Sequence, residues 1–147
     1  MRNTILILLV CLFFIGCKKD GPYSSTPSLK YKSVDTKYLA PGGIIKFTLS
    51  FTDAEGDLDS LYVEKVNPKC ALSGSIERFY VSDALVHLKS KSDDLLVSFG
   101  FRVSGYTPIK EPQCQKNDTC YYRFALLDKA KHHSDTVRSE TVVIQYQ

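Results

Sequence analysis

The stretch Ile45-Lys46-Phe47-Thr48-Leu49-Ser50-Phe51 decides the fold class of this 147-residue chain. Its apolar residues occupy every second position, and polar residues lie between them. Because successive side chains of a β-strand point to opposite faces of a sheet, this alternation predicts a strand with one buried face. Similar segments lie at residues 29–39, 61–66, 76–81, 95–103, 120–126 and 140–146. Residues 83–91 fit either a short strand or a helical turn.

Turn-forming residues such as Pro41-Gly42-Gly43 and Asn67-Pro68 separate these segments, and no segment has a convincing helical period. About seven strands spaced by turns predict an all-β fold, an antiparallel β-sandwich of about seven strands over residues 29–147. The last third begins with the Tyr-rich run at residues 121–130 and returns as Thr141-Val142-Val143-Ile144. It resembles the final hairpin of bacterial immunoglobulin-like and fibronectin type III-like domains. The resemblance implies an immunoglobulin-like sandwich without the Cys–Trp–Cys pattern of antibody domains.

The N-terminus has the pattern of an export signal. Arg2 precedes an apolar run from Ile5 to Gly16, which is too short to cross ~30 Å of hydrocarbon. Phe14-Ile15-Gly16-Cys17 resembles a bacterial lipobox, with Phe14 in place of the usual Leu. The resemblance implies cleavage before Cys17 and attachment of acyl chains, such as palmitate, to Cys17; several such chains make a stable membrane anchor. The alternative is an ordinary secretory signal that is cut elsewhere and leaves Cys17 as a free thiol.

These features predict three parts: a signal peptide at residues 1–16, the lipidated Cys17 with a flexible tether at 17–28, and the sandwich at 29–147. The tether is rich in Pro, Ser and Gly, as flexible linkers are. Lys18 and Lys19 resemble the residues that follow Cys in lipoproteins sorted to the outer membrane. We therefore expect a lipid-anchored protein of the bacterial cell envelope, at the outer membrane, on its periplasmic or its surface-exposed face.

Three cysteines fall within the predicted domain, and this odd number allows at most one internal disulfide. Cys114 and Cys120 flank a short turn-rich segment, so we expect them to pair. The alternative joins Cys70 to one of the two and would link distant strands. A zinc site is disfavoured, because the cysteine and histidine spacing fits no paired-ligand motif.

An acidic loop, Asp53-Ala54-Glu55-Gly56-Asp57-Leu58-Asp59, follows the strand quoted above. It resembles Asp-x-Asp-Gly-Asp loops of immunoglobulin-like lipoprotein and cadherin-like domains. In such a sandwich the loop before the last strand lies at the same end, which brings Asp128 close. Ca²⁺ binds six to eight oxygen ligands, so the predicted ligands are Asp53, Glu55, Asp57, Asp59 and Asp128. The alternative is a plain turn in which Asp side chains cap their own backbone, with Lys129, Lys131, His132 and His133 as counter-charges.

Lys and Arg total 19 against 16 Asp and Glu, which is too balanced for a nucleic-acid-binding protein. No catalytic residues are predicted: His87 lies in an undecided segment, and His132-His133-Ser134-Asp135 are sequence neighbours, whereas triads converge from separate elements. We expect a non-enzymatic, membrane-anchored binding or scaffolding domain for an envelope protein or glycan, with no cofactor unless Ca²⁺ binds. The alternatives are a Ca²⁺-dependent adhesion or stability module and, less favoured, a small envelope hydrolase.

Overall fold

The computed structural model describes residues 23–80 and 91–146. The predicted signal peptide, Cys17, His87 and nearly all of the undecided segment lie outside these described residues. Among the described residues, no helix has the length and apolarity needed to cross a membrane.

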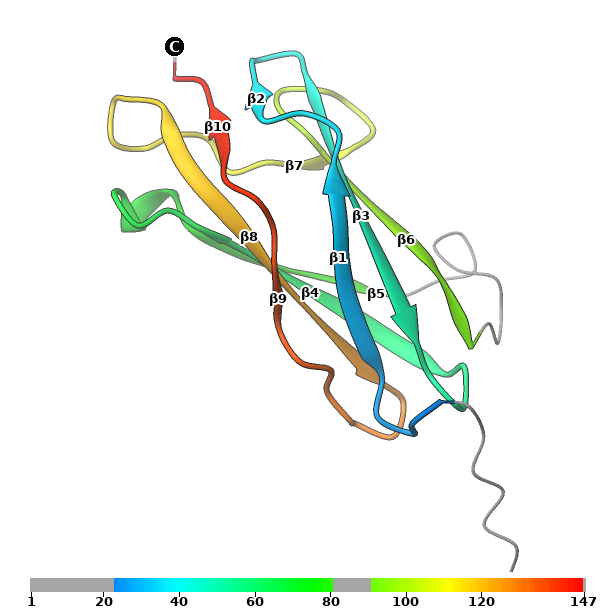
Figure 1. Ribbon diagram of the computed structural model, residues 1–147. Coiled ribbons are helices and arrows are strands. Elements are labelled where there is room, and N and C mark those ends of the chain that lie inside the picture. The colour runs from blue at the N-terminus through cyan, green and yellow to red at the C-terminus, as the bar shows by residue number, and fades with distance from the viewer. Residues whose placement is uncertain (1–22, 81–90, 147) are drawn as a thin grey trace, which may run out of the picture.

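Two sheets face each other in the described chain, which confirms the predicted all-β sandwich (Figure 1). The first sheet has the order β1 (Ser28–Val34), β3 (Ile44–Thr52), β6 (Ser92–Gly100), β7 (Thr107–Pro108). The second has the order β2 (Tyr38–Leu39), β10 (Val142–Ile144), β8 (Asp118–Asp128), β4 (Leu58–Val66), β5 (Ser75–Tyr80), and β9 (Val137–Arg138) also pairs with β8. A short 3₁₀ turn spans Ala71–Ser73.

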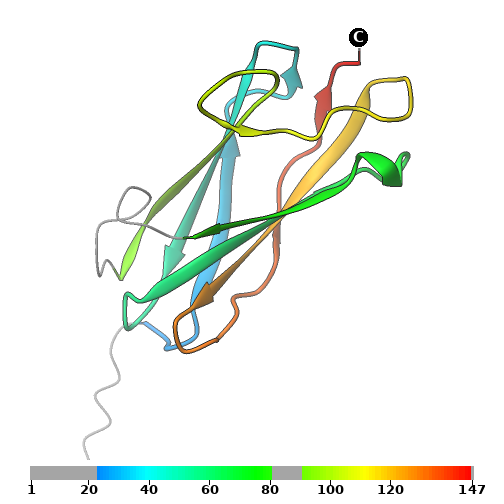
Figure 2. The same cartoon turned by 180° about the vertical axis from the view of Figure 1, so that it is seen from behind.

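Strands β1, β3 and β6 oppose strands β5, β4, β8 and β10, which is the strand arrangement of an immunoglobulin-like sandwich. Figure 2 shows the two layers from behind. The prediction of a purely antiparallel sandwich is wrong in one respect. Strand β2 pairs with β10 in parallel, and β7 pairs with β6 in parallel. The predicted strand at residues 29–39 is in fact two strands: β1 joins the first sheet, and β2 crosses to the second.

The core lies between β3 and β8. Ile45, Phe47, Leu49 and Phe51 of β3 are at most 2% exposed, as their alternation predicts. The inward side chains of β8 face them, and the Phe47 ring centroid lies 4.7 Å from that of Tyr122. Full burial of one such side chain contributes roughly 1.5–3 kcal/mol, so this double row holds the two sheets together.

Strand β6 ends at Gly100, three residues before the predicted end. A Cβ at Gly100 would lie 2.9 Å from Tyr106 Cβ, so only glycine allows the returning segment to pack this closely. Arg102 then adopts a positive φ of 57°, which turns the chain away from the strand. The chain returns as β7 beside the end of β6, an element that the alternation did not reveal.

A buried ion pair lies at the end of the sandwich opposite the acidic loop. Lys65 Nζ donates to Asp118 Oδ2 at 2.7 Å and to the Lys110 carbonyl at 2.6 Å. Asn67 donates to the other Asp118 oxygen at 2.6 Å. The Lys65 and Asp118 side chains are 1% and 0% exposed. Because both carboxylate oxygens are satisfied, the charges are tolerated inside the protein.

The disulfide joins Cys70 to Cys114, with a Cα–Cα distance of 6.1 Å. The predicted Cys114–Cys120 pair is therefore wrong, and the alternative that used Cys70 holds. Cys120 belongs to the inward row of β8 and is a free, fully buried thiol. Its side chain faces the core, whereas Cys114 precedes the strand and pairs with Cys70. The disulfide instead links the segment after β4 to the segment before β8.

We expect Cys70→Ser to lower the free energy of unfolding by about 4 kcal/mol, the loop-closure value for a ring of this length; the two cysteines are 44 residues apart. Urea unfolding measures this loss. Cys120→Ala is the control, because it removes a cysteine and leaves the disulfide intact. Peptide mapping of the unreduced protein should give a cross-linked peptide that contains Cys70 and Cys114, and a Cys114–Cys120 peptide would contradict this pairing.

Candidate functional site

The acidic loop is a tight turn between β3 and β4. Asp53 follows β3, is 0% exposed, and accepts a hydrogen bond at its Oδ2 from the Asp57 backbone N–H at 2.9 Å. Gly56 has a φ of +65°, a conformation that suits glycine. The side-chain cap that the sequence offered as an alternative to a metal site is therefore present, and it uses one of the two Asp53 oxygens.

Three of the five predicted metal ligands gather in this turn. One carboxylate oxygen each from Asp53, Glu55 and Asp57 lies within 4.8 Å of the other two. Asp53 Oδ1 is buried and has no hydrogen-bond partner. Glu55 is exposed and Asp57 half-buried, so the cluster opens to solvent on one side.

Asp59 does not join this cluster. Its Oδ2 accepts hydrogen bonds from Ser60 at 2.7 Å and Arg78 at 2.9 Å, and Lys131 lies 3.8 Å away. The Ser60 hydroxyl, with help from Lys131 and Arg78, holds the pKa of Asp59 below its usual value. The pairing of β4 with β8 is irregular between Leu58 and Ser60, which breaks the alternation at Asp59. Asp59 therefore serves as a partner of cations.

Asp128 ends β8 at the same end of the sandwich, as expected (Figure 1). The Lys129 backbone N–H donates to the Asp57 carbonyl at 3.0 Å, which joins the two loops. Asp128 nevertheless belongs to its own turn: Oδ1 accepts from the His132 backbone N–H, and Oδ2 lies 2.8 Å from His132 Nδ1. It therefore adds negative charge beside the cluster and is not one of its grouped ligands.

The residues weighed for a hydrolase have structural roles in the described chain. Ser134 is buried, accepts from the Leu126 backbone N–H at 2.9 Å and donates to the Asp135 carbonyl at 2.9 Å. His132 contacts Asp128. Burial raises the pKa of the Cys120 thiol to about 12, so this cysteine stays protonated at neutral pH.

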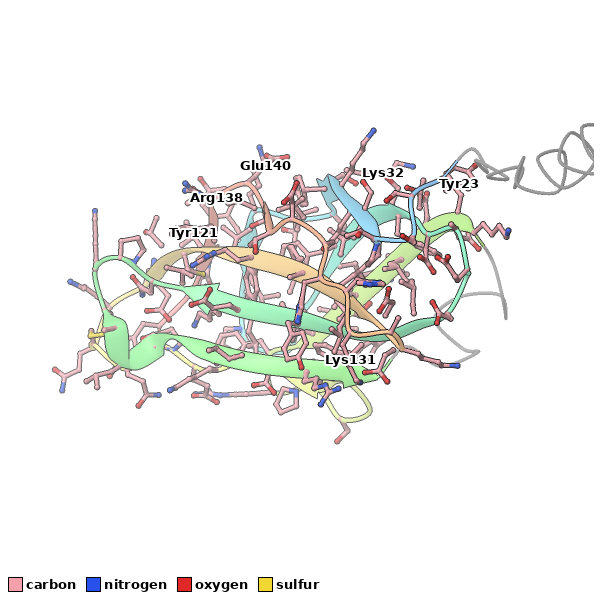
Figure 3. The ribbon with its side chains drawn as sticks, turned by 90° about the horizontal axis from the view of Figure 1, so that it is seen from below. Tyr23, Lys32, Tyr121, Lys131, Arg138 and Glu140 are labelled. Atoms are coloured by element: carbon pink, nitrogen blue, oxygen red, sulfur yellow. A yellow bond between two sulfur atoms is a disulfide. The ribbon has the colours of Figure 1, made fainter. Side chains whose placement is uncertain are left out.

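A second surface feature, which sequence reasoning missed, lies on the outer face of the sheet formed by β5, β4, β8 and β9. We call it the tyrosine–arginine face; it consists of Tyr62, Arg78, Tyr121, Arg123 and Arg138. Arg138 stacks on Tyr121 with its guanidinium carbon 3.7 Å from the ring centroid, and the two side chains lie together in Figure 3. Arg78 lies over the Tyr62 ring at 5.3 Å. Their outward positions follow from strand alternation, but their adjacency depends on the cross-strand register.

Two hollows flank the second sheet. A shallow one of about 190 Å³ opens on the tyrosine–arginine face, lined by Tyr62, Glu64, Ile76, Arg123, Phe124, Ala125 and Thr136. A larger one of about 270 Å³ lies between the two sheets beside β5 and β6 and is mostly apolar, with Phe79, Leu95 and Tyr106 among its lining residues. None of the described residues that line the larger hollow is an acid, a base or a cysteine, so these residues offer no acid–base pair.

The fold defines the chain as an immunoglobulin-like β-sandwich domain. No family model matches the chain, and no curated protein matches it either. Among solved structures, the SrpA adhesin of Streptococcus sanguinis, as a mutant, is similar at 18% identity and a TM-score of 0.37, over 85% of this chain and 57% of that one. A chain from a structure on T cell specificity and activation by the bacterial superantigen toxic shock syndrome toxin-1 is similar at 12% identity and a TM-score of 0.35, over 81% of this chain and 98% of that one. This chain thus spans little more than half of the adhesin structure, and TM-scores this low assign no function.

The surroundings of Asp57 in the acidic loop raise the pKa of its carboxyl group. Burial, followed by the charges of Asp53 and Asp128, raises the pKa of Asp57, while Lys129 lowers it in part. A carboxyl whose pKa is higher in the folded state than its unfolded value of about 3.9 favours folding when protonated. This contribution is lost as the pH rises through the folded-state pKa.

We therefore expect Asp57→Asn to raise the melting temperature at pH 7 in the presence of EDTA. The gain should shrink as the pH falls through the folded-state pKa of Asp57 and vanish below about 4, where the unmodified carboxyl is protonated in both the folded and the unfolded state. Calorimetric melting between pH 3 and pH 7 measures both effects. Asp135→Asn removes an exposed carboxylate from the neighbouring loop and is the matched control. A lower melting temperature for Asp57→Asn at pH 7 would show that this charge does not oppose folding.

Proposed function

We propose that this protein is a lipid-anchored envelope lipoprotein whose sandwich binds an anionic envelope glycan through the tyrosine–arginine face. The observation that carries this proposal is the stack of the exposed Arg138 on the half-buried Tyr121. Exposed Tyr and Arg side chains are the residue types that most often contribute binding energy at interfaces. An Arg held flat on a ring keeps its planar donors available for carboxylate or phosphate groups.

The charges around this face favour an anionic partner. Four cations lie on or beside it, Arg78, Arg123, Arg138 and Lys131, against two carboxylates that pair with three of them, Asp59 and Glu64. Arg138 makes no ion pair with any residue in the described ranges. The exposed Ile76 and the half-buried Tyr62 add apolar surface beside the shallow hollow, where a sugar ring can pack.

The anchor in this proposal is a lipidated Cys17 at the end of the predicted signal peptide. The described chain enters the domain at the acidic loop, because the Ala54 backbone N–H donates to the Ser24 carbonyl at 3.0 Å. Ser24 is seven positions after Cys17, and an extended chain of that length spans at most about 25 Å. The acidic-loop end would therefore lie near the lipid, with the tyrosine–arginine face along the side of the domain. The last part of the predicted tether packs on the domain, since Pro27 is buried and β1 begins at Ser28.

A binding role also accounts for the state of the residues that a hydrolase would need. The Ser134 hydroxyl bonds two backbone groups, and the Cys120 thiol is buried and protonated. Neither side chain is positioned as a nucleophile. We therefore propose a non-enzymatic protein.

Substitutions on the face test the binding role. We expect Arg138→Ala to weaken binding of purified lipopolysaccharide, or of polygalacturonate, about tenfold, which corresponds to ~1.4 kcal/mol. Tyr121→Ala should act in the same direction, because it removes the support of the guanidinium. Lys32→Ala is the matched control: it also removes one exposed cation, from the edge strand β1 of the other sheet. Equal losses in Arg138→Ala and Lys32→Ala, or no binding of either polymer, would contradict the assignment of this face.

Labelling with a fatty acid tests the anchor. Cells that express the intact chain should incorporate label into the mature protein, which should fractionate with membranes. Cys17→Ser should abolish both, because it removes the thiol that would be acylated. If the Cys17→Ser protein is still processed normally and stays with the membrane, Cys17 is not the anchor.

A further inference from the structure

The acidic loop concentrates negative charge, and none of its carboxylates belongs to the tyrosine–arginine face. Carboxylate oxygens of Asp53, Glu55 and Asp57 lie within 4.8 Å of one another. Two basic side chains of the neighbouring turn contact other carboxylates, since Lys131 lies next to Asp59 and His132 contacts Asp128. Lys129 acts on Asp57 through its charge alone and forms no ion pair with the described residues of the cluster. Within residues 23–80 and 91–146, the cluster therefore has no ion-pair partner to balance its charge.

Asp53 supplies a second and independent observation. Its side chain is fully buried, and Oδ2 is occupied by the Asp57 backbone N–H. Oδ1 is also buried and has no hydrogen-bond partner. A buried carboxylate oxygen without a partner is costly, because it has lost its water and gained nothing in exchange. The turn provides a hydrogen-bond partner for Asp53 Oδ2 and none for Asp53 Oδ1.

We propose that Asp53, Glu55 and Asp57 form a Ca²⁺ site, with Asp53 Oδ1 as its buried ligand. The donors are all carboxylate oxygens, which suit a hard cation and not zinc. Ca²⁺ accepts six to eight oxygens in irregular geometry, so water completes the shell on the open side at Glu55, whereas Mg²⁺ requires a nearly ideal octahedron. The exposed side of Glu55 is also the route by which the ion enters.

The position of this site gives the ion a structural role. Asp57 accepts the Lys129 N–H through its carbonyl, so an ion on the Asp57 carboxylate stabilises the contact between the β3–β4 loop and the turn after β8. Ca²⁺ therefore stiffens the end of the sandwich at which the described chain begins, and binding does not depend on the tyrosine–arginine face.

Calorimetry on the purified full chain tests this site. Titration with CaCl₂ should give one site with a Kd of about 0.1–1 mM, the range of extracellular Ca²⁺ modules. At about 10 mM CaCl₂ the melting temperature should rise by roughly 5 °C relative to EDTA. MgCl₂ at the same concentration should give a clearly smaller rise. An unchanged melting temperature with CaCl₂, or equal rises with CaCl₂ and MgCl₂, would overturn the proposal.

Glu55→Gln is the decisive variant, because this exposed side chain can lose its charge without disturbing the buried turn. It should fold normally in EDTA and weaken Ca²⁺ binding at least about tenfold. Asp57→Asn should also remove most of the Ca²⁺-dependent rise, whereas Asp135→Asn, the matched charge control, should keep the wild-type Kd. An unchanged Kd in Glu55→Gln would overturn the site. In EDTA, Glu55→Gln should bind polysaccharide as tightly as the wild type does. The experiments can therefore contradict the Ca²⁺ site without contradicting the tyrosine–arginine face, and the reverse.

Discussion

The packing of Phe47 between the two sheets is the interaction on which the rest of this structure depends. Its ring lies within 6.3 Å, centroid to centroid, of Phe99 in its own sheet and of Tyr122 and Phe124 in the opposite one. This cluster aligns β3 with β8, the central strands of the two layers. Both strands are long and end at the same end of the sandwich. The acidic loop, which follows β3, and the turn after β8 therefore lie next to each other. The core thus determines which charged loops meet.

Polar interactions then determine details that apolar packing leaves open. The Lys65–Asp118 pair and the Asn67 amide join β4, β8 and the segment beyond β4 inside the protein. Removal of one partner from a buried pair of this kind typically costs about 3–5 kcal/mol, so the pair strongly disfavours a shifted register between these strands. The Cys70–Cys114 disulfide ties the same end covalently. One end of the sandwich is therefore held by internal bonds, while the acidic end lacks an equivalent link among the described residues, and a bound ion would supply one there.

The two proposed sites occupy different parts of the domain and use opposite charges. The tyrosine–arginine face presents cations from neighbouring strands on the outer surface of the second sheet, and Figure 3 labels Tyr121 and Arg138 there. The Ca²⁺ site gathers carboxylates within one turn. A lipid anchor ahead of residue 24 would place the acidic end near the membrane and leave the side of the sheet accessible to partners. A binding domain held at a membrane in this way requires neither a nucleophile nor a catalytic cofactor.

The sequence by itself determined the all-β class, most strands and the buried rows, because alternation and turn residues are local signals. The topology implied by the resemblance to immunoglobulin-like domains placed Asp128 at the same end as the acidic loop. Lys65 could have been noticed too, since it shares the inward parity of Leu61 and Val63. Only the tertiary structure decided the partner of Cys114, the split of residues 29–39 between two sheets, the diversion of Asp59 to Arg78, and the stacking of Arg138 on Tyr121. Each of these depends on register and distance between segments far apart in the chain. Such contacts depend on how the whole core packs, and a local sequence pattern does not predict that packing.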